Sequence, residues 1–227
     1  MPAYTLLPDD TVTAPDGATL YRIQYEDGTR GGYLQSTANL DPTSDARVYG
    51  NAQVYGNAQV YGNAWVYGNA QVYGNAWVSG DAWVSGNAWV SGNAWVSGNA
   101  QVFGNARVSG NARVSGDAWV SGDAWVSGNA QVFGNARVYG NAWVSGNARV
   151  SEPQHCLTIG PLGSRAAILT VCRDSTLGIS YATGCFFGSR DAFLAAVEAT
   201  HGDSPTGNAY TAAVMLADHV VPPYTQE

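Results

Sequence analysis

The chain has 227 residues, 28 of them glycine, and its ten basic residues, all arginine, are outnumbered by 17 acidic ones, for a net charge of −7. No stretch approaches the roughly 18 apolar residues of a membrane-spanning helix. The opening sequence MPAYTLLPDD has neither the basic region nor the apolar core of a secretory signal. We therefore expect neither a membrane protein nor a classically secreted one.

The charge is distributed unevenly. Residues 1–45 hold seven acids against two arginines, a net of −5; residues 46–151 have a net of +2, and the remainder a net of −4. Affinity for duplex nucleic acid comes mainly from neutralising phosphates, so an acidic chain is a poor candidate for it. A DNA mimic would need rows of carboxylates, and the middle third offers only Asp81, Asp117 and Asp123.

A small antiparallel cap is predicted in residues 1–45. Apolar and polar residues alternate over 11–36 around two turn signals, Asp16-Gly17 and Asp27-Gly28. This pattern predicts strands near Ala18 to Tyr25 and near Gly32 to Gln35.

A hexapeptide repeat, A-x-V-[YSF]-G-[ND], then fills residues 46–151, with 18 valines spaced six apart from Val48 to Val150. Ala and Val, two positions apart, point to one side of a short strand, while x and the Tyr, Ser or Phe point to the other. Gly-Asn supplies a corner that tolerates positive φ. Fixed-period self-similarity is typical of a solenoid.

This repeat resembles that of hexapeptide-repeat left-handed parallel β-helices, which implies three hexapeptides per triangular coil. The fold class predicted is mainly β: about six coils of the β-helix, a small β cap before them and an α+β domain after them. Stacking at about 4.8 Å per coil gives a prism about 29 Å long. The non-repeat ends are expected to cap it, because bare coil ends would polymerise.

The x positions form three outward columns, one on each face of the prism. The first column is Arg47, Trp65, Trp83, Gln101, Trp119 and Arg137; the second is Gln53, Gln71, Trp89, Arg107, Trp125 and Trp143; the third is Gln59, Trp77, Trp95, Arg113, Gln131 and Arg149. All eight tryptophans of the chain therefore point outward, with on the order of 1,200–2,000 Å² of surface between them. We expect a partner to cover part of it.

Nine residues of these columns are the candidate binding residues: Trp65, Trp83, Trp89, Trp95, Arg107, Arg113, Trp119, Trp125 and Trp143. Two interpretations remain open. The stacked side chains could cover one another and serve packing alone, or they could form a binding surface. Arg107, between Trp89 and Trp125 in its column, predicts a cation–π sandwich that is either structural or a site for an anion or a planar ring.

Residues 152–227 change character and predict a separate α+β domain packed on the last coil. Apolar-rich stretches at Leu157 to Ile159, Ala166 to Val171 and Gly178 to Tyr181 predict strands. Ser189 is a candidate N-cap for a helix that extends to His201 and is closed by Gly202. A second helix is predicted from Ser204-Pro205 to Pro222-Pro223, burying Tyr210, Val214 and Ala217.

Beyond the repeat, the chain resembles phage and prophage proteins with YGNAxV arrays. The shared elements are Ala14 to Gly17, the junction GGYLQSTANL from Gly31 to Leu40, the array itself, Gly184 to Gly188, and His201-Gly202. The resemblance implies a phage-encoded accessory protein. It brings no established activity and no catalytic residues.

The resemblance to hexapeptide-repeat proteins suggests an enzyme, but the residues of this chain support that expectation only weakly. Many hexapeptide-repeat proteins are acyltransferases and some are zinc carbonic anhydrases, and both chemistries need histidines at the coils. His155, His201 and His219 all lie outside the array. No catalytic residue, metal site or cofactor is therefore assigned.

Two alternatives remain for the C-terminal domain. Cys185 precedes a predicted helix N-terminus, where a thiolate is favoured, and His201 with Asp203 could complete a Cys-His-Asp arrangement. A zinc site from Cys156, Cys172, Cys185 and His201 would lack the short paired spacing of zinc ligands. Three cysteines, an odd number, do not suggest a disulfide framework, so a reducing compartment is expected.

The predicted function is a non-enzymatic binding or assembly protein. It would bind or sequester a host protein or a small-molecule ligand, with inhibition of host defence as one candidate role, in the cytoplasm of the host cell or in the virion. A homo-oligomer is expected, with a trimer favoured. The alternatives are a virion spacer or spike, a hexapeptide-type transferase and a cysteine-dependent enzyme; fold alone does not choose among them.

Overall fold

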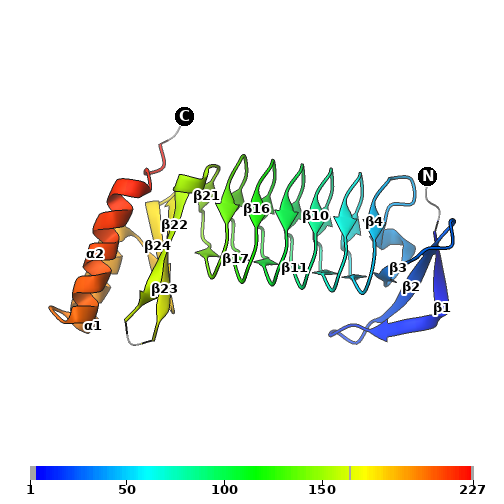
Figure 1. Cartoon of the computed structure of the whole chain (residues 1–227), viewed down its shortest axis with the longest axis horizontal. Coiled ribbons are helices and arrows are strands. Elements are labelled where there is room, and N and C mark those ends of the chain that lie inside the picture. Colours follow the sequence, from blue (N-terminus) through cyan, green and yellow to red (C-terminus); the bar gives the residue numbers. More distant parts are fainter. Residues whose placement is uncertain (1–3, 164, 226–227) are drawn as a thin grey trace.

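The computed structural model describes residues 4–163 and 165–225. The molecule is an elongated rod, with a β-sheet at its N-terminal end, regular coils along its length, and a sheet with two helices at its C-terminal end (Figure 1). Within the described residues, no helix is both long and apolar enough to cross a membrane.

The array folds as a three-sided parallel β-solenoid. Each hexapeptide contributes one two-residue strand, and strands three repeats apart pair in parallel. The first face contains β4 (Arg47–Val48), β7 (Trp65–Val66), β10 (Trp83–Val84), β13 (Gln101–Val102), β16 (Trp119–Val120) and β19 (Arg137–Val138). The second contains β5 (Gln53–Val54), β8 (Gln71–Val72), β11 (Trp89–Val90), β14 (Arg107–Val108), β17 (Trp125–Val126) and β20 (Trp143–Val144). The third contains β6 (Gln59–Val60), β9 (Trp77–Val78), β12 (Trp95–Val96), β15 (Arg113–Val114), β18 (Gln131–Val132) and β21 (Arg149–Val150).

The core of the rod is made of the repeat's alanines and valines. All of them are buried, and together they form one continuous apolar cluster along the prism. Val96, for example, is fully buried and pairs with Val78 on one side and Val114 on the other. The inward assignment of the valine position is confirmed.

Each coil is bonded to the next by its backbone and its corners. The N–H of every x residue that has a following coil donates to an alanine carbonyl there, as from Trp95 to Ala112 at 2.9 Å. The corner asparagines also form amide ladders. In the longest, which runs from Asn57 to Asn147, each Nδ2 donates to the Oδ1 eighteen residues on, at 3.0–3.2 Å. These ladders fix the register of the coils from outside the core.

The corner glycines have no substitute in this geometry. In the array their φ values lie between +60° and +73°, a region that favours glycine. From Gly50 to Gly128, each also stacks on the glycine of the next coil: a Cβ on Gly98 would lie 2.9 Å from the backbone N of Gly116. Conformation and stacking therefore both require glycine there.

The N-terminal cap has three strands, β1 (Tyr4–Thr13), β2 (Thr19–Tyr25) and β3 (Arg30–Leu34). The two strands predicted from the sequence correspond to β2 and β3. β1 was not predicted, because most of it precedes the alternating pattern of residues 11–36. β3 pairs in parallel with β5, and Leu40 bridges to Val60, so the cap adds an irregular turn to the solenoid. The solenoid has about seven turns, one more than the array alone predicted.

Side chains of the cap form hydrogen bonds with backbone N–H and carbonyl groups of the first coil. The Tyr25 hydroxyl accepts from the N–H of Val48 and donates to its carbonyl, at 2.9 and 3.2 Å. After the short 3-10 helix η1 (Thr37–Asn39), Asn39 Nδ2 donates to the carbonyls of Gly56 and Ala58, at 3.1 and 2.9 Å. Buried polar groups left unpaired are costly, so these contacts stabilise the end of the rod.

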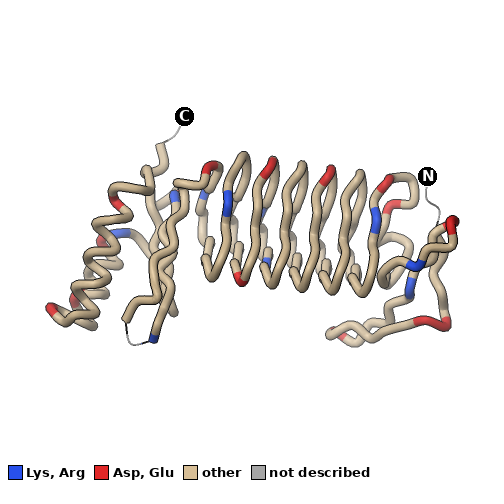
Figure 2. Tube along the Cα trace, viewed as in Figure 1, with Lys and Arg blue, Asp and Glu red and all other residues tan. Residues whose placement is uncertain are grey.

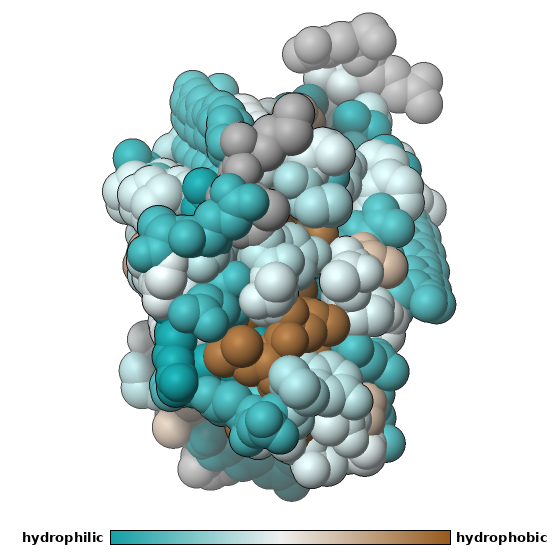
Figure 3. Space-filling view, turned by 90° about the vertical axis from the view of Figure 1, so that its right-hand side faces the viewer, coloured by the Kyte–Doolittle hydropathy of each residue, from teal (hydrophilic) through white to brown (hydrophobic). Residues whose placement is uncertain are grey.

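The outer edge of this cap is unsuited to pairing with another chain. β1 is the edge strand of its sheet, and its register with β2 breaks between Leu7 and Thr11, where Pro8, Asp9 and Asp10 intervene. Proline, charge and a bulge are the devices that block edge-to-edge association. Viewed end-on, this face shows only a small apolar patch within a polar surface (Figure 3).

The C-terminal cap is a four-stranded antiparallel sheet covered by two helices. After η2 (Pro153–His155), it comprises β22 (Cys156–Leu162), β23 (Ala167–Asp174), β24 (Gly178–Thr183) and β25 (Phe186–Gly188), followed by α1 (Arg190–His201) and α2 (Pro205–Val220). Ser189 and Gly202 cap α1, and Ser204 caps α2, as predicted. β25 was not predicted, because three residues carry too little periodicity.

The two faces of this sheet have different neighbours. Leu169 and Val171 of β23 face the helices and pack with Tyr181, Phe193 and Val214. Cys172, one residue further along, faces the opposite way and joins the core of the solenoid. The period of two along a strand thus lets one sheet bury helices on one side and plug the last coil on the other.

The disulfide Cys156–Cys172 corrects the prediction made from the cysteine count. These residues lie directly opposite each other on β22 and β23, with Cα atoms 4.1 Å apart. Of the three cysteines, only Cys185 is free. Disulfides are rare in reducing compartments, so the cysteines no longer support the expectation of one.

A buried charge in the valine column tests the core assignment. Val96→Asp places a carboxylate between Val78 and Val114, and we expect it to lower the free energy of unfolding by several kcal/mol. Asn93→Asp, at a corner where the repeat already tolerates aspartate elsewhere, should cost about 1 kcal/mol or less. Thermal unfolding followed by circular dichroism compares them; equal melting of Val96→Asp and the parent would contradict the inward valine column.

Two alanine substitutions separate backbone conformation from stacking. Gly140 (φ +66°) and Gly98 (φ +65°) share a conformation, but a Cβ on Gly140 meets nothing within 4 Å. Gly140→Ala should cost about 1–2 kcal/mol, and Gly98→Ala about 1–3 kcal/mol more, because the neighbouring coil must move. Denaturant unfolding of both variants measures the difference, and equal losses would rule out tight stacking.

His155 gives the C-terminal junction a dependence on pH. Its ring is buried, with Nδ1 3.1 Å from Ser151 Oγ and Nε2 3.4 Å from the Arg173 guanidinium. Burial, and then Arg173, lower the pKa of His155, while Glu152 opposes them weakly. Because the unfolded chain takes up this proton more readily, the stabilisation is present above about pH 6.5 and is lost as the pH falls below it. His155→Gln should show a shallower loss of thermal stability between pH 7.5 and 5 than the parent; parallel profiles would contradict this role.

Candidate functional site

The outward columns lie where the sequence placed them, because strand pairing brings each x residue beside the x residues of the coils before and after it. The nine candidate residues, Trp65, Trp83, Trp89, Trp95, Arg107, Arg113, Trp119, Trp125 and Trp143, are distributed over all three faces. They therefore form three separate surfaces and not one site.

The first column contains a tryptophan pair and an arginine on a ring. Trp65 and Trp83 stack with centroids 5.9 Å apart and an interplanar angle of 19°. Beyond Gln101, the Arg137 guanidinium lies 4.5 Å from the centroid of Trp119. This is the shortest of the arginine–tryptophan contacts in the columns.

The second column departs from the predicted sandwich. Arg107 lies over Trp89 at 5.1 Å. Trp125, its neighbour on the other side, instead stacks on Trp143 at 6.1 Å and donates its Nε1–H to Ser109 Oγ at 3.2 Å. Arg107 thus has an aromatic contact on one side, because the indole of Trp125 turns toward a corner serine that was not considered.

The third column contains the closest tryptophan stack. Trp77 and Trp95 are 5.1 Å apart and inclined by 4°, and Arg113 lies over Trp95 at 5.1 Å. At the C-terminal end of this face, Arg149 lies 5.7 Å from the Phe133 ring and 5.7 Å from the Tyr224 ring. The contact with Tyr224, which lies beyond α2, was not predicted, because it joins residues far apart in the sequence.

Both interpretations of the tryptophans hold in part. Stacking covers ring faces, as the packing interpretation expects, yet seven of the eight side chains remain 36–45% exposed, and only Trp143 is more deeply buried. Corner aromatics add cover by edge contacts, as Tyr61 does to Trp77 and Phe103 to Trp119. These aromatics were predicted to lie on the outward side of each strand, but their edge contacts with the tryptophans were not predicted. In the stacked pairs, one face of each ring is covered by its partner, and the ring edges remain at the surface.

The column arginines are electrostatically unpartnered. Arg107, Arg113, Arg137 and Arg149 form no salt bridge with any residue in the described part of the chain. The array's aspartates are at the corners, where they accept from asparagines, as Asp117 does from Asn99 at 2.7 Å. Figure 2 shows the scattered basic positions along the coils and the acidic positions concentrated toward the ends.

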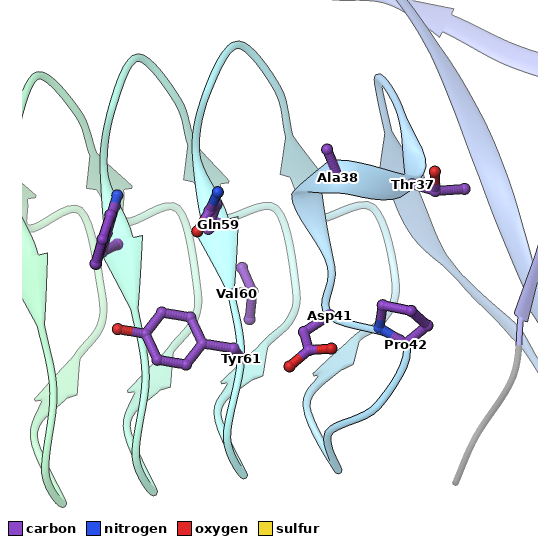
Figure 4. A pocket seen from close by; sticks show the side chains of 8 residues that line it. Thr37, Ala38, Asp41, Pro42, Gln59, Val60 and Tyr61 are labelled. Carbon is purple, nitrogen blue, oxygen red and sulfur yellow. The ribbon is translucent and has the colours of Figure 1, made fainter.

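A shallow groove lies at the N-terminal end of the third face, with a volume of about 460 Å³. Asp41 and Pro42 form its cap side, and Gln59, Tyr61 and Trp77 form its solenoid side. The side chains of Asp41 and Tyr61 are seen here in neighbouring turns (Figure 4). Because Trp95 covers one face of Trp77, this groove is bounded by the opposite side of that ring.

The structure bears on both hypotheses for the cysteines, the Cys-His-Asp arrangement and the zinc site. Cys185 is exposed in the turn between β24 and β25 and lines the same cavity as His201. Asp203 does not line that cavity and, among the described residues, forms no hydrogen bond or ion pair with His201 or Cys185, so no hydrogen-bonded Cys-His-Asp arrangement is formed. The zinc alternative is wrong as composed, because two of its four proposed ligands, Cys156 and Cys172, are joined to each other.

Comparison with protein-family models identifies the repeat. The YdcK beta solenoid repeat matches residues 52–68, 58–71, 70–86, 82–98, 100–114, 112–128 and 130–146. No curated protein matches the chain. The protein is therefore a repeat β-solenoid whose array is similar to that family, and all the matched residues lie within the array.

Proposed function

We propose that this protein is a non-enzymatic binding scaffold whose tryptophan–arginine columns hold a protein partner with an acidic surface. One observation carries the proposal: Arg107, Arg113 and Arg137 each lie on a tryptophan ring and have no carboxylate partner within the described chain. Tryptophan and arginine are the residues most enriched at interaction hot spots.

Ring edges favour a protein partner over a stacking ligand. A nucleobase or sugar needs a free aromatic face, and in the pairs Trp65–Trp83 and Trp77–Trp95 one face of each ring is already covered. A protein surface can pack on ring edges and offer carboxylates to the guanidinium groups at the same time. A small-molecule ligand fits best in the groove beside Trp77, which is the secondary candidate.

The rod is also suited to holding the columns in a fixed arrangement for a binding partner. The columns rest on a dry Ala/Val core and on amide ladders, so little side-chain or backbone order has to be gained on binding. Both ends are covered by caps, which favours a discrete particle over a fibre. A homotrimer, in which three copies share such faces, is the oligomer we propose.

The biological setting that we propose rests on the resemblance to phage and prophage YGNAxV proteins. It supports a phage- or prophage-encoded accessory protein that binds or sequesters a host protein, with an inhibitor of host defence as a candidate role, acting in the host cytoplasm. The elongated form favours one alternative, a spacer in the virion.

The test is affinity capture from infected cells, followed by binding of the purified partner to variants. The triple variant Trp89→Ala, Arg107→Ala and Trp125→Ala should weaken binding at least about 100-fold, since each hot-spot truncation costs about 2 kcal/mol or more, while thermal unfolding shows that the fold is kept. Cys185→Ala is the matched control and should bind as the parent does. Loss of biological activity with Cys185→Ala, together with its retention in the triple variant, would contradict the proposal and favour an enzyme.

A further inference from the structure

The C-terminal domain contains a cavity separate from the columns. It has a volume of about 380 Å³ and lies among α1, the start of α2, the end of β22 and the β24–β25 turn. This size is within the range of small-molecule sites, about 300–1,000 Å³. The scaffold function proposed above makes no use of it.

The floor of the cavity is aromatic and buried. Phe193 is 2% exposed and contacts Phe186 and Tyr210, with ring centroids 5.2 and 5.7 Å apart. Val197, also buried, completes this apolar surface. An apolar or aromatic body is the ligand part that such a floor accommodates.

The rim is polar and carries only positive or neutral groups. Arg165, Cys185 and Thr200 are exposed there, and His201 stacks on Tyr210 with centroids 5.8 Å apart. Arg165 forms no ion pair or hydrogen bond with any described residue, and none of the cavity's lining residues is acidic. An unpaired guanidinium beside an apolar cavity, in a domain that is otherwise acidic, is complementary to a single anionic group.

A third feature also distinguishes this cavity. The Oγ1 of Thr183, a lining residue at the end of β24, is buried and has no hydrogen-bond partner. Unsatisfied buried hydroxyls are uncommon and costly. This unpaired hydroxyl is therefore a further polar group in the wall of the cavity.

We propose that this cavity binds a small amphipathic anion: an aromatic or branched apolar body resting on Phe193 and Tyr210, with a carboxylate paired to Arg165. The Cys185 thiol lies at the entrance, so an occupant shields it. The site requires no catalytic step and is independent of the columns.

Cys185 reports occupancy directly, because it is the one free thiol. Its thiolate attacks a sulfur of an aromatic disulfide reagent, the reagent's S–S bond breaks, a protein–aryl mixed disulfide forms and an aryl thiolate leaves. Dithiobis(nitrobenzoate) carries carboxylates and an aromatic ring, whereas dithiodipyridine has a similar ring and no negative charge. We expect the reaction rate to saturate with concentration for the first reagent and to rise linearly for the second.

Naphthoate and Arg165→Gln make the test decisive. Naphthoate should protect Cys185 from both reagents, and its neutral amide should protect at least tenfold less well. Arg165→Gln should lower the affinity for naphthoate roughly tenfold, the loss expected for a charge-assisted contact, without changing the linear rate of dithiodipyridine. Ala196→Leu, which fills the cavity from α1, should abolish protection while the thermal midpoint is retained. Linear kinetics with both reagents and no protection by naphthoate would overturn the site, whatever the outcome for the columns.

Discussion

In-register stacking is the constraint on which the rest of the structure depends. An x-residue N–H can be satisfied only by a carbonyl of the next coil, as Trp95 N is by Ala112 O at 2.9 Å, so the coils must repeat at a fixed length of eighteen residues. Residues of the same type then stack in adjacent coils: valine on valine in the core, and asparagine on asparagine and glycine on glycine at the corners. The same rule creates the outward columns, because it places each x residue beside the x residues of the adjacent coils. Only the side-chain rotamer stays free, as the turn of Trp125 toward Ser109 shows.

The sequence was informative wherever period and local chemistry decide the structure. The inward valines, the outward tryptophans, the Ser189 cap and the ends of both helices were predictable because each depends on spacing within a few residues. The Cys156–Cys172 pair was not, because it depends on the register of a hairpin with an irregularity between Ile159 and Leu162. Long-range placement also decided the features that could not be predicted: the turn of Trp125 toward Ser109, the groove beside Asp41, and the cavity that both Cys185 and Arg165 line.

The two proposed sites have different physical origins. In the columns, regularity exposes side chains that cannot satisfy one another: arginine stacks on tryptophan, but only aspartates at the corners are near in sequence, and those accept hydrogen bonds from asparagines. In the C-terminal domain, irregularity produces a cavity, since a short β24–β25 turn and two helix ends fail to close over an aromatic floor. The rod presents cations along its length and the proposed small-molecule site lies at one end, so the two proposed sites are independent of each other.

Disulfide trapping at the corners tests the eighteen-residue register most directly. In a Cys185→Ser background, Ser97→Cys with Ser115→Cys places two thiols in adjacent coils at one corner, with Cα atoms about 5 Å apart, within disulfide reach. Ser97→Cys with Ser91→Cys places them at different corners of one coil. Mild oxidation followed by mass spectrometry should show near-complete pairing in the first variant and almost none in the second. Pairing in the second variant, or equal pairing in both, would contradict the stacking and the columns that follow from it.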